Sequence, residues 1–239
     1  MRRHKIHALH GFLGSPEDWY SLGFEEVEDF FTVHLFKDLP IISFDEWARQ
    51  FNQCVAEGED CREKPLLMGY SLGGRLGLHA LLQQPNNWKA AIFMSTHPGL
   101  KSTQERDLRI AADEKWAKRF EDEPWDSLMQ DWNAQNIFKN VAPHRSEGEN
   151  SRLVFSSALK IWSLGNQQDL SQELAVLNMP ILWIVGAEDE KFYKIAQQLE
   201  FKHPQSTVYA IPEAGHRVLW EQSEKCKLKI SEFIRNLKE

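Results

Sequence analysis

A short, uninterrupted apolar run at residues 65–70 restricts the fold of this chain more than any other feature. A strand with consecutive apolar residues is buried on both faces, which is typical of a parallel sheet covered by helices. Strand-like runs recur along the chain with helical segments between them, such as the one that begins with the capping-box spacing of Ser43 and Glu46. The sequence therefore predicts an α/β fold with a mostly parallel sheet and helices on both faces.

The expected strands divide the chain into a core and an insertion. Strands are predicted at residues 5–9, 32–36, 65–70, 90–94, 181–185 and 207–211, and helices at 43–56, 73–84 and 221–237. Between residues 98 and 179 the strand signal disappears, and the segment is charged, helical and rich in tryptophan. We therefore predict a core built from 1–97 and 180–239, with a helical cap inserted at 98–179.

Composition restricts the compartment and the partners. The net charge of −7 argues against a general nucleic-acid surface or a surface for anionic membranes. The three cysteines, Cys54, Cys61 and Cys226, have no metal-like spacing and are expected to be free thiols in a reducing cytosol. No apolar window approaches the ~20 residues of a membrane span, so a cytoplasmic protein without membrane insertion is expected. We expect it to be a monomer or a small homo-oligomer.

A serine between two glycines follows the buried run. Gly69, Ser71 and Gly73 have the spacing of a nucleophile elbow, and they stand between a predicted strand and a predicted helix. The glycines allow the sharp turn that exposes the serine hydroxyl above the sheet. Ser71 is therefore a candidate catalytic residue.

A serine in this position needs a histidine base and an acid that orients the base, in the chain order serine, acid, histidine. Asp189 and His216 follow predicted strands in that order, at the carboxyl ends where ligands bind in open α/β sheets. Glu188 and Glu190 are alternative acids beside Asp189. The sequence thus predicts a triad of Ser71, Asp189 and His216.

The glycine-rich turn after the first strand can supply an oxyanion hole. The backbone N–H groups of Phe12 and Leu72 are predicted to stabilise negative charge on a substrate oxygen. Each of the residues singled out also has an ordinary structural reading: Ser71 as a helix cap, Asp189 as a turn former and His216 as a surface histidine. Their common position at strand ends, in the required order, favours a catalytic site.

The chain resembles the α/β-hydrolase superfamily over nearly its full length, and more closely the menaquinone-pathway family MenH, the 2-succinyl-6-hydroxy-2,4-cyclohexadiene-1-carboxylate synthases. The residues that carry the resemblance are HGFLGSPEDW (10–19), GYSLGGRLGL (69–78), HPGL (97–100), ERDLRIAADEKWAKRF (105–120), DWNAQNIF (131–138) and GAEDEKF (186–192). The cap segments are the specific part, because a generic esterase has no reason to share them. The chain departs from the pattern at 38–42, where related hydrolases commonly have Gly-His-Gly.

The resemblance implies an elimination that releases pyruvate from 2-succinyl-5-enolpyruvyl-6-hydroxy-3-cyclohexene-1-carboxylate, without a metal or an organic cofactor. It implies that Arg75, Arg109, Tyr70 and Trp132 contact this anionic, polycarboxylate small molecule, because guanidinium groups suit carboxylates. Arg109 can instead pair with Glu105 or Asp113 on its own helix. For the third arginine of the family, Arg145 is favoured over Arg152.

Two other functions remain open at this point. A carboxylesterase or carbon–carbon bond hydrolase would use Ser71 as a nucleophile and accumulate an acyl-enzyme. A non-catalytic binding protein would retain the fold alone, since a fold does not establish a function.

Overall fold

The computed structural model describes residues 3–24, 26, 28–58, 63–138, 141, 143–148 and 151–237. Its centre is a six-stranded parallel sheet with the strand order β2-β1-β3-β4-β5-β6. The strands are β1 (Lys5–Leu9), β2 (Asp29–Val33), β3 (Leu66–Tyr70), β4 (Ala90–Met94), β5 (Ile181–Gly186) and β6 (Thr207–Ile211). The predicted α/β fold is confirmed.

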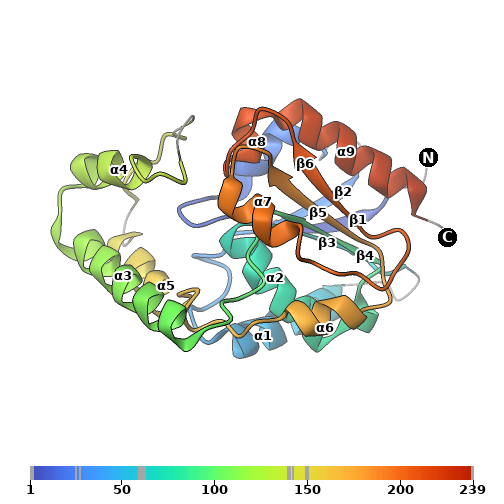
Figure 1. Ribbon diagram of the computed structural model, residues 1–239, viewed down its shortest axis with the longest axis horizontal. Helices are drawn as coiled ribbons and strands as arrows, with labels where there is room; N and C mark the ends of the chain where they lie inside the picture. Colours follow the sequence, from blue (N-terminus) through green and yellow to red (C-terminus); the bar gives the residue numbers. More distant parts are fainter. Residues whose placement is uncertain are drawn as a thin grey trace.

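Helices cover both faces of the sheet (Figure 1). One face carries α1 (Phe44–Gly58), α2 (Leu72–Gln83), α6 (Ser171–Val176) and α7 (Glu190–Ala196), and the other carries η1 (Pro16–Leu22), α8 (Val218–Glu221) and α9 (Ser223–Asn236). The short η2 (Pro85–Asn87) follows α2. Adjacent residues of β5 point to opposite faces of the sheet. Trp183 packs against the first group of helices and Leu182 against the second. Burial on both faces explains why the central strands are apolar throughout.

Two predicted elements were misplaced, since the second strand begins and ends three residues earlier than predicted and the C-terminal helix has other bounds. The second strand ends at Val33, three residues before the predicted end, because Leu35 lies in the loop after it. The side chain of Leu35 is fully buried and its N–H donates to Nε2 of His10 at 3.1 Å, so its apolar character reflects a packed loop. The predicted C-terminal helix begins earlier and is broken at Gln222 into α8 and α9.

The segment predicted to be a cap folds into helices between β4 and β5. They are α3 (Thr103–Asp122), α4 (Trp125–Asn133) and α5 (Ser151–Ile161), which lie together beside the sheet in Figure 1, followed by α6. The predicted capping box starts α3, since Ser102 Oγ accepts from the N–H of Glu105 at 3.1 Å. Phe120, Leu128 and Leu159 form a third core, against which Phe12 of the β1 loop packs.

Of the cysteines, Cys54 is exposed and Cys226 is buried, and both are free thiols. Cys61 lies outside the described residues. No helix in the described part of the chain is long and apolar enough to span a membrane.

The contact between α2 and β1 predicts a sharp difference between two glycines. A Cβ atom on Gly73 would lie 2.2 Å from the carbonyl oxygen of Leu9, whereas a Cβ on Gly58 would meet nothing within 4 Å. We expect Gly73→Ala to lower the free energy of unfolding by about 3 kcal/mol, because backbone must move, and Gly58→Ala to change it by less than about 0.5 kcal/mol. Urea denaturation of both variants measures this, and equal stabilities would contradict the packing described.

Candidate active site

Ser71 occupies the turn between β3 and α2 in a strained backbone conformation. Its φ is 51° and its ψ is −110°, a region that costs a residue with a side chain roughly 1–3 kcal/mol. The turn is tight, since a Cβ on Gly69 would lie 2.6 Å from the Cα of Gly74, and one on Gly74 would lie 1.9 Å from Oγ1 of Thr96. The surrounding packing therefore maintains the strain.

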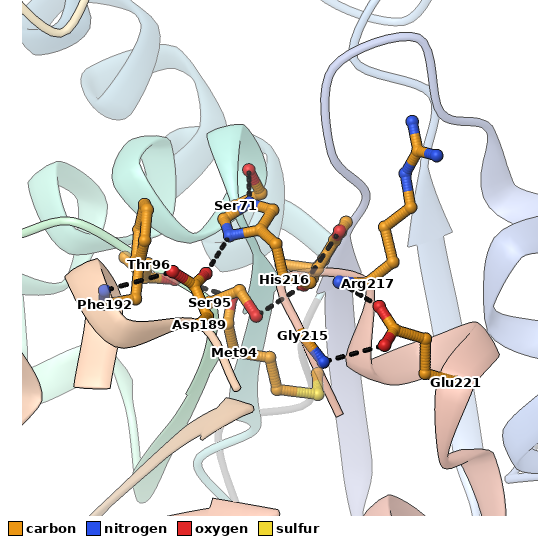
Figure 2. A network of polar contacts seen from close by, with 11 residues as sticks. Ser71, Met94, Ser95, Thr96, Asp189, Phe192, Gly215, His216, Arg217 and Glu221 are labelled. Atoms are coloured by element: carbon orange, nitrogen blue, oxygen red, sulfur yellow. Dashed lines mark hydrogen bonds and ion pairs between the residues drawn. The ribbon is translucent and has the colours of Figure 1, made fainter. Parts of the chain in front are cut away.

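Ser71, His216 and Asp189 form a continuous hydrogen-bonded chain (Figure 2). His216 Nδ1 lies 2.8 Å from Asp189 Oδ2, and Nε2 lies 3.1 Å from Ser71 Oγ. Because the carboxylate only accepts, we assign the ring proton to Nδ1, which leaves Nε2 to accept the hydroxyl proton of Ser71. Asp189 and His216 are buried, whereas the alternative acids Glu188 and Glu190 are exposed.

Core hydrogen bonds hold both partners of the serine. Asp189 Oδ1 accepts from the N–H of Phe192 at 3.2 Å. The carbonyl oxygen of His216 accepts from the hydroxyls of Tyr70 at 3.3 Å and of Ser95 at 2.8 Å. Burial raises the pKa of Tyr70 far above its usual range, so this phenol remains a donor.

The two candidate oxyanion donors both line the cavity that contains Ser71. Leu72 is the first residue of α2, so its N–H has no acceptor within the helix. Phe12 lies in a turn closed by the N–H of Gly14 on the carbonyl of Gly11 at 3.0 Å, with Leu13 at a φ of 58°. Both residues thus lie beside Ser71, and the role of their N–H groups stays a prediction.

The cavity above Ser71 has a volume of about 260 Å³ and lies between core and cap. Its walls include the aromatic side chains of Trp116, Trp132 and Phe138 from the cap. The rings of Trp132 and Phe12 are 5.0 Å apart, which joins the cap to the β1 loop. Trp132, one of the predicted contact residues, therefore forms part of the cavity wall.

Arg75 brings a positive charge into this cavity without an acidic side chain to neutralise it directly. In the described part of the chain, its guanidinium donates to the carbonyl of Trp162 at 2.8 Å and to Oε1 of Gln167 at 3.4 Å, both neutral. Burial, together with the charge of Arg109, lowers the pKa of Arg75 to about 9. An anion in the cavity would relieve this cost.

Arg109 lines the same cavity from α3. Its Nε donates to Asp113 Oδ2 at 2.8 Å, and the same oxygen accepts from Ser163 Oγ at 2.7 Å. The pairing within the helix is therefore present. Only Nε of the guanidinium takes part in it, and the group still faces the cavity.

His97 also lines the cavity, although sequence reasoning gave it no role. Its Nδ1 accepts from the N–H of Gly99 at 3.0 Å, so the neutral ring carries its proton on Nε2. Burial and the neighbouring cations lower the pKa of His97 to about 3. The ring is thus a neutral hydrogen-bond donor at physiological pH.

Of the two candidates for a third arginine, only Arg145 lies near Ser71. It lines a smaller adjacent cavity, and both its terminal nitrogens bond the carboxylate oxygens of Asp18 at 2.8 Å. Arg152 instead bonds Glu147 and the backbone carbonyls of Phe120 and Glu123. Sequence reasoning missed Arg217, which lines the smaller cavity too, although it directly follows His216.

Within the described residues, no group of three His, Cys, Asp or Glu side chains converges in a way that could hold a metal ion. The chemistry that the geometry offers is proton transfer at Ser71 beside cationic side chains.

Comparison with known proteins finds a matching family model and relatives that share one name. Residues 62–223 match the family model described as alpha/beta hydrolase fold. The 2-succinyl-6-hydroxy-2,4-cyclohexadiene-1-carboxylate synthase of Yersinia pestis bv. Antiqua (strain Nepal516) is 32% identical, over 87% of this chain and 79% of that protein. The protein of the same name from Serratia proteamaculans (strain 568) is 29% identical, over 95% of this chain and 92% of that protein.

Solved structures agree in fold. The structure of MenH from S. aureus superposes with a TM-score of 0.87 at 22% identity, covering 100% of this chain and 96% of that one. A malate-bound thermophilic esterase from Thermogutta terrifontis gives a TM-score of 0.72 at 19% identity, covering 98% and 90%.

The buried neutral His97 predicts a loss of stability in acid. Its folded pKa of about 3 lies below the unfolded value of 6.5, so as pH falls below about 6.5 the unfolded state takes up a proton that the folded state excludes. At pH 5 this costs about 2 kcal/mol. His97→Asn keeps an acceptor for Gly99 but does not titrate. We expect the loss of unfolding free energy between pH 7 and pH 5, measured in urea, to be about 2 kcal/mol smaller in this variant than in wild type. An unchanged pH dependence would contradict the buried neutral ring.

Proposed function

The chain belongs to the α/β-hydrolase family, and within it to the 2-succinyl-6-hydroxy-2,4-cyclohexadiene-1-carboxylate synthases; from this premise we propose that it eliminates pyruvate from 2-succinyl-5-enolpyruvyl-6-hydroxy-3-cyclohexene-1-carboxylate. The product is 2-succinyl-6-hydroxy-2,4-cyclohexadiene-1-carboxylate, an intermediate of menaquinone biosynthesis. The reaction is a carbon–oxygen lysis rather than a hydrolysis.

The observation that carries the proposal is the presence of a complete Ser-His-Asp chain and partly buried cations in one cavity. In the described residues, Arg75 donates only to neutral acceptors, and it shares a cavity with Ser71 and Arg109. A site of this kind favours a substrate with several carboxylates, because each carboxylate can replace the water lost by a guanidinium. A neutral ester gains nothing from these charges.

Ser71 acts as the base in the proposed mechanism. Asp189 orients His216, whose Nε2 accepts the hydroxyl proton, and the serine oxygen removes a proton from the substrate ring. The electrons of that C–H bond then pass through the ring double bond and expel the enolpyruvyl oxygen as the enolate of pyruvate. This enolate takes up the proton held by His216 and becomes pyruvate, which returns the triad to its starting state. The N–H groups of Phe12 and Leu72 stabilise the negative charge that develops on a substrate oxygen.

The walls of the cavity set the position of the ring. Arg75 and Arg109 bind carboxylate groups, and Trp132 packs against the apolar face of the substrate. Tyr70 and Arg145 line the smaller cavity on the other side of Ser71 and contact the substrate there. Neither a metal nor an organic cofactor takes part in this scheme.

Pyruvate release tests the proposal directly. We expect wild type to release pyruvate from the enolpyruvyl substrate, Ser71→Ala to lower kcat by about 10³-fold, and Arg75→Ala to lower kcat/KM by about 100-fold. Arg49→Ala is the matched control, because Arg49 pairs with Glu46 on the exposed side of α1. Pyruvate is measured for all four proteins with coupled lactate dehydrogenase, and Arg49→Ala should retain wild-type kinetics.

A panel of simple esters separates the lyase from a hydrolase. Turnover of esters with a burst of acyl-enzyme, and no pyruvate from the enolpyruvyl substrate, would refute the lyase mechanism and establish Ser71 as a nucleophile. Pyruvate release at the wild-type rate by Ser71→Ala would refute the role of the serine in either reaction.

A further inference from the structure

Ser71 lies where two cavities meet. Besides the larger cavity, a smaller one of about 50 Å³ is lined by Ser71 and Tyr70, and both cavities share Phe12, Trp132 and Phe138. The reacting serine therefore faces two compartments rather than one. The larger compartment holds Arg75 and Arg109, and the smaller holds Arg145 and Arg217.

Arg217 supplies the smaller cavity with a buried charge. The residue is 6% exposed, and its guanidinium lies 4.1 Å from the centre of the Phe138 ring. Within the described residues, its terminal nitrogens donate to Oδ1 of Asn133 at 2.5 Å and to the carbonyl of Val141, both neutral acceptors. Burial and the neighbouring Arg145 lower the pKa of Arg217, so the cation gains from an anionic ligand.

Among the described residues, no carboxylate is hydrogen-bonded to this guanidinium. Glu221 accepts from the backbone N–H groups of Gly215 and Arg217, at 2.7 and 3.1 Å. Figure 2 shows the side chain of Arg217 extending away from that carboxylate, toward the side on which the Ser71 hydroxyl lies. Asp18 is occupied by its two bonds to Arg145. Arg145 thus has a carboxylate partner, whereas Arg217 has no direct ion pair within the part of the chain that the structure describes.

We propose that the smaller cavity is a second carboxylate site, in which Arg217 binds the carboxylate of the departing pyruvate while the larger cavity retains the ring. This inference rests on the proposed function. The substrate carries one carboxylate on the leaving enolpyruvyl group, separate from the carboxylates of the ring and the succinyl chain. Two cationic compartments on either side of Ser71 match that division.

The position of Arg217 in the chain suits this role. It directly follows His216, whose carbonyl is fixed by Tyr70 and Ser95, so the backbone that carries the guanidinium is held to the triad. Binding the carboxylate of the leaving group there holds that group in position while its oxygen breaks from the ring. Arg217 is therefore a substrate-binding residue that determines specificity for an enolpyruvyl leaving group.

Product binding tests the division of the two compartments. Pyruvate and the cyclohexadiene product are titrated separately into wild type, Arg217→Met and Arg75→Met, with dissociation constants from ligand-observed NMR and inhibition constants from turnover. We expect Arg217→Met to weaken the binding of pyruvate at least about tenfold, and the binding of the cyclohexadiene product by less than about threefold. Arg75→Met should show the reverse, and Arg217→Lys should recover part of the pyruvate affinity.

A second variant separates ligand binding from attachment of the cap. Asn133→Ala removes the contact of Arg217 with α4 but leaves its charge in place. We expect pyruvate affinity in this variant to stay within about threefold of wild type. If Arg217→Met and Asn133→Ala each weaken the binding of both products to the same extent, Arg217 serves only to attach the cap. That result would overturn the inference.

The two proposals fail in different ways. If wild type releases pyruvate during turnover while Arg217→Met binds pyruvate as wild type does, the second carboxylate site is refuted and the lyase function stands. If wild type binds pyruvate through Arg217 but releases none from the enolpyruvyl substrate, the lyase function is refuted and the small-carboxylate site stands.

Discussion

The close approach of the β3–α2 turn to its neighbours is the constraint on which the site depends. Gly73 lies against the carbonyl of Leu9 in β1, and Gly74 lies against Thr96 after β4, at distances that no Cβ would allow. This packing holds Ser71 at a positive φ and directs its hydroxyl toward His216. It also fixes the start of α2, so Arg75 enters the cavity one helical turn later.

The charges around Ser71 are arranged unequally. Arg109 and Arg145 each have a carboxylate partner, Asp113 and Asp18, whereas Arg75 bonds neutral oxygens only within the described residues. Holding cations in this way destabilises the empty protein, since burial disfavours their charged form. Such a cost at a functional site is common, because the ligand recovers it on binding. The fold thus keeps these cations around Ser71 at some expense of stability.

Much of this arrangement could be predicted from the sequence, because it depends on strand order. Ser71, Asp189 and His216 come together since the carboxyl ends of parallel strands share one edge of the sheet. Arg217 and His97 could not be assigned, because their surroundings are created by cap residues distant in sequence, among them Asn133 and Arg109. The end of β2 was misplaced because an apolar residue in a packed loop looks like one in a strand. Local pattern thus located the reacting groups, whereas tertiary packing determined which charged side chains surround them.

The carbonyl of His216 is bonded by Tyr70 and Ser95, which both belong to the core. Asp189 is likewise fixed from α7, so within the described residues none of the hydrogen bonds that align the triad comes from the cap. The cap contacts the triad by ring packing, since the ring centres of Phe138 and His216 are 5.9 Å apart. Discrimination between molecules then falls on admission to the cavity rather than on assembly of the reacting groups. Remodelling α3–α5 can therefore change part of the cavity wall, while the hydrogen bonds of the three residues and the charges of Arg75 and Arg217 are inherited from the core.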